Sequence, residues 1–126
     1  METNTQAAAR ARDFFDDYRD ALLARDIDRI AAAYHCPALI AFPAQVVAVT
    51  APAQTRTFFE NAVGQYAGVT RARGDVTVLA ATEHSIWADV TWDYDGAAPA
   101  ERMVYQLLDT GDEWLIGVLT PVLGAS

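Results

Sequence analysis

The sequence contains no lysine, so all nine of its basic residues are arginine. Seventeen acidic residues outnumber them and give a net charge of −8 at pH 7. An acidic chain repels nucleic-acid phosphates and the anionic headgroups of a membrane surface. We therefore expect neither a nucleic acid nor a membrane among the partners of this protein.

Cysteine and histidine are also scarce. The single cysteine, Cys36, excludes an internal disulfide and is compatible with a reducing compartment. No zinc-ligand spacing, glycine-rich phosphate loop or nucleophile elbow is present in the sequence. The apolar runs are too short to span a bilayer, and the first residues lack the apolar core of a signal peptide. These absences predict a soluble, cytoplasmic protein that uses no metal or cofactor.

The length of 126 residues corresponds to one domain, which we place at residues 1–126. Apolar residues make up 52% of the chain and charged residues 21%, which is ordinary for a globular protein. A domain of this size hides about two thirds of the surface of its unfolded chain, so it can form one hydrophobic core.

Three helices are predicted from apolar residues at helical spacing. The first covers residues 6–24, the second begins after the capping residue Asp26, and the third runs from Pro52 to about Ala67. We expect Pro37 to end the second helix, because the residue before a proline avoids the helical conformation. The expected buried stripes are Phe15, Tyr18 and Leu22, then Ile27, Ile30 and Tyr34, then Phe59, Ala62, Val63 and Tyr66.

Strands are predicted where valine, threonine and aromatic residues cluster between turn residues, one such turn being Asp95-Gly96. The expected strands are 39–42, 45–50, 75–82, 86–94, 102–108 and 114–122. Helices followed mainly by strands in hairpins predict an α+β fold, with three N-terminal helices on one face of a curved mixed or antiparallel sheet. Helices that lean into a curved sheet leave a cone, and such hollows are common ligand sites.

The segment DIDRIAAAY, which follows a tyrosine-bearing helix and precedes a strand ending in Phe42-Pro43, resembles the ketosteroid isomerases. The ending EWLIGV after a DTGD turn is similar to the last hairpin of the NTF2-like superfamily. This superfamily, also called SnoaL-like, has a cystatin-like α+β cone, and the resemblance covers nearly the whole chain. It includes isomerases, cyclases, dehydratases and many non-enzymes, so the resemblance implies a fold more than a function.

The resemblance to ketosteroid isomerases can be followed residue by residue. Tyr18 stands at the place of their oxyanion-hole tyrosine and Tyr34 at that of a supporting tyrosine, whereas Phe59 replaces their third tyrosine. Phe42 stands where they carry the catalytic aspartate, and Val104 where they carry a second, protonated one. Phenylalanine cannot accept a proton, so we predict that this chain is not a ketosteroid isomerase.

Alternation along residues 86–94 sends only one set of side chains into the cone. The resemblance favours the set that contains Trp92 as the inner one, with Asp89 and Asp93 facing out; a shift of one residue would reverse this and make Asp89 the best candidate base. The residues expected to line the cone are Tyr18, Tyr34, Phe42, Phe59, Ile86, Val90, Trp92 and Tyr94.

Three functional hypotheses remain open. The first is a binding module that holds a small, mostly apolar molecule in the cone. The second is a cofactor-independent acid–base enzyme of the cyclase, isomerase or dehydratase kind, with a base such as Asp89 or His84. The third is a dimerisation module without a ligand. A tryptophan on the outer sheet face, Trp87, predicts a homodimer formed through that face.

Overall fold

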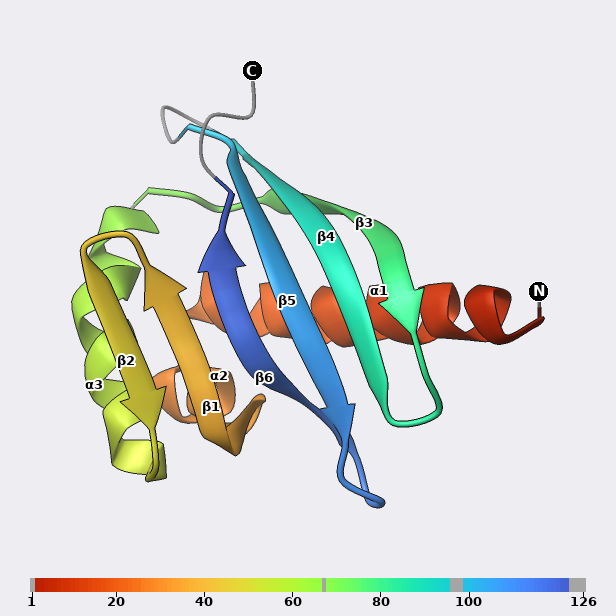
Figure 1. Ribbon diagram of the computed structural model, residues 1–126. Helices are drawn as coiled ribbons and strands as arrows, with labels where there is room; N and C mark the ends of the chain where they lie inside the picture. Colours follow the sequence, from red (N-terminus) through yellow and green to blue (C-terminus); the bar gives the residue numbers. More distant parts are fainter. Residues whose placement is uncertain (1, 67, 96–98, 123–126) are drawn as a thin grey trace.

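The computed structural model describes residues 2–66, 68–95 and 99–122. Its six strands form one sheet, and its helices lie on one face of that sheet (Figure 1). The elements are α1 (Glu2–Ala24), α2 (Ile27–Ala32), β1 (Tyr34–Phe42), β2 (Gln45–Val49), α3 (Pro52–Ala62), the 3-10 turn η1 (Val63–Tyr66), β3 (Ala72–Ala81), β4 (Ser85–Tyr94), β5 (Glu101–Asp109) and β6 (Trp114–Pro121).

The sheet has the strand order β2-β1-β6-β5-β4-β3. All neighbouring strands are antiparallel except β1 and β6, which run parallel, so the sheet is mixed. Figure 1 shows α1 crossing behind β3 to β6, while α2 and α3 lie behind β1 and β2. The predicted α+β arrangement of helices on a curved sheet is confirmed.

The core lies between this helical layer and the inner face of the sheet. Helix α1 contributes the buried residues Ala11, Phe15 and Tyr18, and alternate residues of β4 and β5 meet them from the sheet. The alternation follows from the period of two along a strand, which sends successive side chains to opposite faces. The side chains that fill the core therefore come from both ends of the sequence.

The second helix is shorter than the sequence predicted. Asp26 caps it as expected, since its side chain accepts a hydrogen bond from the Arg29 backbone N–H. The helix ends at Ala32, however, and Tyr34 and Pro37 both lie in β1. The reason is a tertiary contact: the Ile116 N–H donates to the Ala33 carbonyl at 2.8 Å, and Tyr34 then pairs with Ile116 of β6. Strand pairing thus overrides the local helical pattern.

The other boundaries agree with the prediction to within a few residues. Helix α3 ends at Ala62 and continues as η1, so the predicted helix is split; its expected last residue, Ala67, lies outside the described residues. The same is true of Gly96 in the predicted turn. Among the described helices, none is both long enough and apolar enough to cross a membrane.

Candidate functional site

The eight residues expected to line the cone come together in one cluster. Six of them are buried core residues, and Phe42 and Tyr94 are half-buried and pack against the six. Their rings lie close to one another, with centroids 5.3 Å apart for Tyr34 and Phe59, for example. Two further aromatic residues belong to this cluster, Phe15 and Tyr105, whose rings lie 4.6 Å apart. Aromatic side chains therefore occupy the interior of the cone.

The polar atoms in this aromatic cluster are paired. The Tyr18 and Tyr34 hydroxyls lie 2.7 Å apart and share a hydrogen bond, and the Trp92 indole N–H donates to the Tyr105 hydroxyl at 3.0 Å. Among the described residues, no buried side-chain nitrogen or oxygen lacks a partner. Such pairing offsets the cost of removing polar groups from water, so the cluster can serve as ordinary core.

Strand β4 turns the face that contains Trp92 toward the helices, as the sequence analysis expected. Ile86, Val90 and Trp92 are at most 2% exposed, whereas Asp93 is exposed on the opposite face. Asp89 also lies on that outer face, where it accepts a hydrogen bond from Arg102 Nε at 3.0 Å. This hydrogen bond lowers the pKa of the Asp89 carboxyl and raises the pKa of Arg102. Asp89 is thus an ion-paired carboxylate on the far side of the sheet from Tyr18.

The two histidines lie in different places. His35 is at the start of β1, and its Nδ1 is 2.8 Å from the Pro37 carbonyl oxygen. His84 is exposed in the turn between β3 and β4. Neither forms an ion pair among the described residues. No group of three or more possible metal ligands is found in that part of the chain either.

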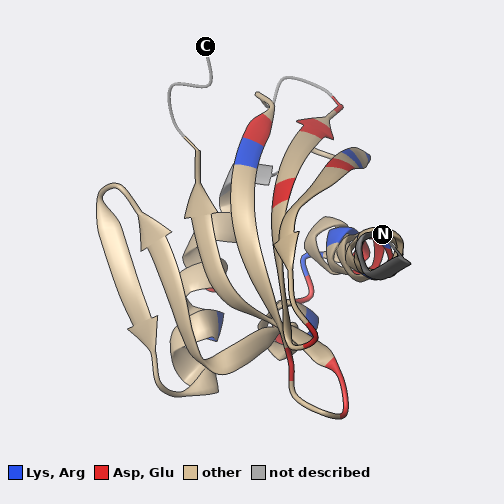
Figure 2. Ribbon diagram, turned by 45° about the vertical axis from the view of Figure 1, so that its right-hand side comes forward, with Lys and Arg blue, Asp and Glu red and all other residues tan. Residues whose placement is uncertain are grey.

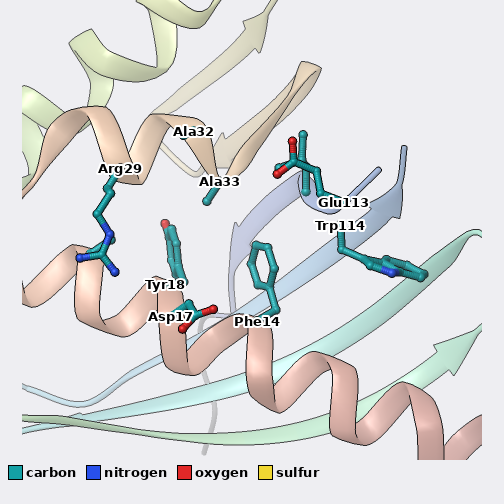
Figure 3. Close-up of a pocket in the computed structure, with 10 residues that line it drawn as sticks. Phe14, Asp17, Tyr18, Arg29, Ala32, Ala33, Glu113 and Trp114 are labelled. Carbon is teal, nitrogen blue, oxygen red and sulfur yellow. The ribbon is translucent and has the colours of Figure 1, made fainter. Parts of the chain in front are cut away.

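A pocket of about 490 Å³ opens beside the aromatic cluster, where α1 and α2 meet the start of β6. Tyr18 belongs to both, because its ring lines the pocket while its hydroxyl bonds to Tyr34. The lining residues are Phe14, Asp17, Tyr18, Ala21, Arg29, Ala32, Ala33, Glu113, Trp114 and Leu115. Figure 3 shows the Phe14 and Tyr18 rings side by side, with Arg29 at one end of the pocket and Glu113 and Trp114 at the other.

Helix α1 supplies one wall of the pocket. Phe14, Asp17, Tyr18 and Ala21 are spaced by three and four residues, which places them on one helical face. The Phe14 and Tyr18 rings stack at 6.3 Å with an interplanar angle of 20°. The apolar wall thus continues from the core residue Tyr18 outward to Phe14.

The rest of the pocket and its rim combine apolar surface with charge. Trp114 is half-buried, and the Arg10 guanidinium lies 5.2 Å from the centre of its ring. Asp17, Arg29 and Glu113 are exposed at the rim and take part in none of the ion pairs among the described residues. The pocket therefore offers aromatic surface together with side chains of both signs whose charges face solvent.

Smaller hollows border other residues that were expected to line the cone. Tyr34 borders a pocket of about 180 Å³ together with His35 and Cys36, the latter an exposed free thiol. Trp92 and Tyr94 border a space of only about 10 Å³. Of the eight expected residues, Tyr18 is the one that reaches the largest pocket described.

The sequence reasoning missed most of that pocket. Of the residues that line it, Tyr18 alone was among those expected to contact a ligand. A usable signal was present in α1: an aromatic residue at position 14 has Tyr18 four residues later, so it extends the apolar face past the buried stripe. No comparable local signal links Arg29 to Glu113, which are brought together by the fold alone.

Comparison with solved structures supports the fold. An NTF2-like protein of unknown function from Shewanella oneidensis matches with a TM-score of 0.73 and 10% identity, over 90% of this chain and 96% of that one. A putative calcium/calmodulin-dependent protein kinase type II association domain from Thiobacillus denitrificans matches with a TM-score of 0.71 and 15% identity, over 86% of this chain and 92% of that one. A putative aromatic ring hydroxylase from Novosphingobium aromaticivorans matches with a TM-score of 0.66 and 14% identity, over 97% of this chain and 92% of that one.

A comparison with curated proteins finds no match. At the identities just given, the solved structures are informative about architecture and not about ligands. The family model described as NTF2-like protein (DUF6841) matches residues 7–123, which is nearly all of the chain. The helices packed on a curved mixed sheet agree with that match, and the chain belongs to this family of NTF2-like proteins.

Proposed function

We propose that the protein binds a small, mostly apolar organic molecule, and that the binding site is the pocket between α1, α2 and the start of β6. The observation that carries this proposal is the composition of that pocket: about 490 Å³ of space with the aromatic residues Phe14, Tyr18 and Trp114 among those that line it. Ligand sites are typically concave and apolar, with a few polar groups that orient the bound molecule.

The rim suggests the polar part of the ligand. Arg29 can receive an acidic group and Glu113 a basic or hydroxyl group, and Figure 3 places these two side chains at opposite ends of the pocket. Because both side chains reach solvent, they contribute more to orientation than to affinity. The apolar body of the ligand would then lie on Phe14 and Tyr18.

Binding is favoured over acid–base catalysis by the positions of the bases that the sequence offered. Asp89 is ion-paired to Arg102 on the outer face of the sheet, and His84 lies in the turn between β3 and β4. A general base must come within hydrogen-bond reach of the proton that it removes. Neither residue lines the pocket that Tyr18 borders.

The direct test uses the dye 1-anilinonaphthalene-8-sulfonate, which has an apolar aromatic body and one anionic group. We expect its fluorescence to rise with the wild-type protein, and Ala32→Trp, which fills the pocket from an exposed position of α2, to weaken binding at least tenfold. Ala24→Trp, at an exposed position at the end of α1, is the matched control. Equal binding by wild type and Ala32→Trp would refute the site, and native mass spectrometry of freshly purified protein would show any retained molecule.

We also propose that two copies pair through their outer sheet faces. Strands β1, β2 and β6 contain no charged residue, as Figure 2 shows, although the chain carries a net charge of −8. On the outer face lie the half-buried residues Trp87 of β4, Val104 of β5 and Val118 of β6. Two such faces can pack on each other as in a β-sandwich.

Sedimentation equilibrium tests this pairing. The wild-type mass at micromolar concentration is expected to be that of two chains, and Trp87→Asp is expected to reduce it to one. Ala24→Asp, on the helical side of the sheet, should leave the dimer intact. A wild-type mass equal to one chain would exclude the pairing at that concentration.

A further inference from the structure

The two edges of the sheet differ in how they are protected. Strand β3 forms one edge and carries Arg73 and Asp75, and its pairing with β4 is interrupted by a bulge between Val78 and Ala80. Charged side chains and bulges are the usual devices that keep an edge strand from pairing with another chain. Strand β2 forms the other edge with the sequence QVVAV and has no charge, no proline and an unbroken register with β1.

Two residues of β2 direct their backbone groups to the free edge. The β1–β2 hairpin closes over two residues, and Phe42 pairs with Gln45 on either side of the turn. A tight turn of this kind places a hydrogen bond between those two residues, and such bonded pairs alternate with unbonded ones along the ladder. The N–H and C=O groups of Val46 and Ala48 therefore point away from β1, and the Val46 side chain is 66% exposed.

A groove of about 310 Å³ runs beside this edge, between β2 and α3. Its residues are Gln45, Val47, Ala53, Gln54, Thr57, Phe58 and Asn61. None of them belongs to β1, because on that side Phe42 packs against Phe58 with ring centroids 5.4 Å apart. The groove thus opens toward the free edge of β2.

The groove is uncharged in a protein that otherwise carries a net charge of −8. A charged occupant would lose its hydration there without gaining a counter-ion, whereas an uncharged one would not. The groove nevertheless contains polar groups. The Asn61 side-chain N–H donates a hydrogen bond to the Thr57 carbonyl, and this bond does not use the Asn61 amide oxygen. The charge pattern therefore selects an uncharged partner.

We propose that β2 is a docking edge for an uncharged, extended peptide segment of another protein. The segment would add a seventh strand by bonding to Val46 and Ala48, and one of its apolar side chains would enter the groove against Val47 and Phe58. Alternation along the added strand sends every second side chain toward α3, so a short segment supplies one side chain for the groove. The backbone would give affinity and the groove would give selectivity.

The test titrates the isotope-labelled full chain with capped hexapeptides of sequence Thr-Thr-Xaa-Thr-Thr-Ser, in which Xaa is Ala, Leu, Phe or Asp. We expect the Leu and Phe peptides to bind with sub-millimolar Kd and the Asp peptide to bind at least tenfold more weakly. The amide signals of Val46 and Ala48 should shift and become protected from hydrogen exchange. Chemical shifts that move only around Tyr18 would place the peptide in the other pocket and overturn the proposal.

Two variants make the assignment specific. Ala48→Pro removes one edge N–H at a position where an edge strand tolerates proline, and Thr57→Trp fills the groove from an exposed helical position without altering the strand. Each should weaken binding of the Leu peptide at least tenfold, whereas Thr77→Trp on the exposed surface of β3 should not. Unchanged binding by Thr57→Trp refutes the groove, and a dimer that Ala48→Pro abolishes would assign the edge to a second copy and refute the peptide.

Discussion

Phe14 and Phe15 are neighbours in α1 and show how the interior of the cone differs from the pocket at its mouth. Phe15 is 1% exposed and contacts the Trp92 and Tyr105 rings, whereas Phe14 is half-buried and lines the pocket. Their rings meet edge to face with centroids 5.1 Å apart. Side chains that touch each other therefore belong to two regions, one that is packed inside the core and one that borders an open pocket.

The largest expected effect separates these two residues. Phe15→Ala should lower the free energy of unfolding by about 3–5 kcal/mol, because it removes a fully buried ring and leaves a cavity. Phe14→Ala should cost about 1 kcal/mol or less, because part of that ring already faces solvent, but it should weaken dye binding. Urea unfolding of both variants measures the difference. Equal losses of stability would show that the two regions are one continuous core.

The next effect tests how tightly the interior is packed. A Cβ added at Gly74 would lie 2.8 Å from a ring carbon of Trp92, a separation that requires the indole to move. Gly74→Ala should therefore destabilise the fold by about 1–3 kcal/mol, as overpacking of a filled core does. Gly64→Ala is the matched control, since a Cβ there meets no atom within 4 Å. If Gly74→Ala unfolds at the wild-type urea concentration, the interior has space that the packing does not suggest.

A smaller effect concerns Tyr18, which belongs to both regions. Tyr18→Phe keeps the ring in the pocket wall but removes the hydroxyl bonded to Tyr34, and it should cost about 1 kcal/mol. Dye affinity should change less than threefold if the ligand uses the ring alone. A larger loss of affinity without a loss of stability would instead place the hydroxyl in contact with the ligand, which the same two measurements would reveal.

The sequence predicted the interior better than the pocket for a physical reason. Strand alternation is local, so the sequence of β4 alone showed that Ile86, Val90 and Trp92 share one face, and the resemblance to the NTF2-like superfamily favoured that face as the inner one. The pocket depends on contacts between distant segments: Arg29 and Glu113 line opposite ends of the same pocket only because β6 runs parallel to β1 beside α2. The error in the predicted end of α2 has the same origin, since the Ala33 carbonyl accepts a hydrogen bond from the Ile116 N–H of β6. What non-local pairing decides, local periodicity could not predict.

The smallest effect lies outside both regions and depends on pH. Asp95 accepts hydrogen bonds from the Thr70 hydroxyl and from the Thr70 and Arg71 backbone N–H groups, which lower its pKa to about 2. A carboxyl whose pKa is depressed on folding stabilises the native state above its unfolded pKa, near 4, and loses that contribution as pH falls toward 2. Asp95→Asn should therefore be less stable than wild type at pH 6, and the two urea midpoints should converge between pH 4 and pH 2.

The control for this prediction is Asp93→Asn, near the end of the strand β4 that Asp95 follows. Asp93 is exposed and takes part in none of the ion pairs among the described residues, so its replacement should alter stability little at any pH in this range. A constant difference between Asp95→Asn and wild type from pH 6 to pH 2 would mean that the side-chain shape at position 95, and not its charge, holds Thr70 and Arg71 against the end of β4.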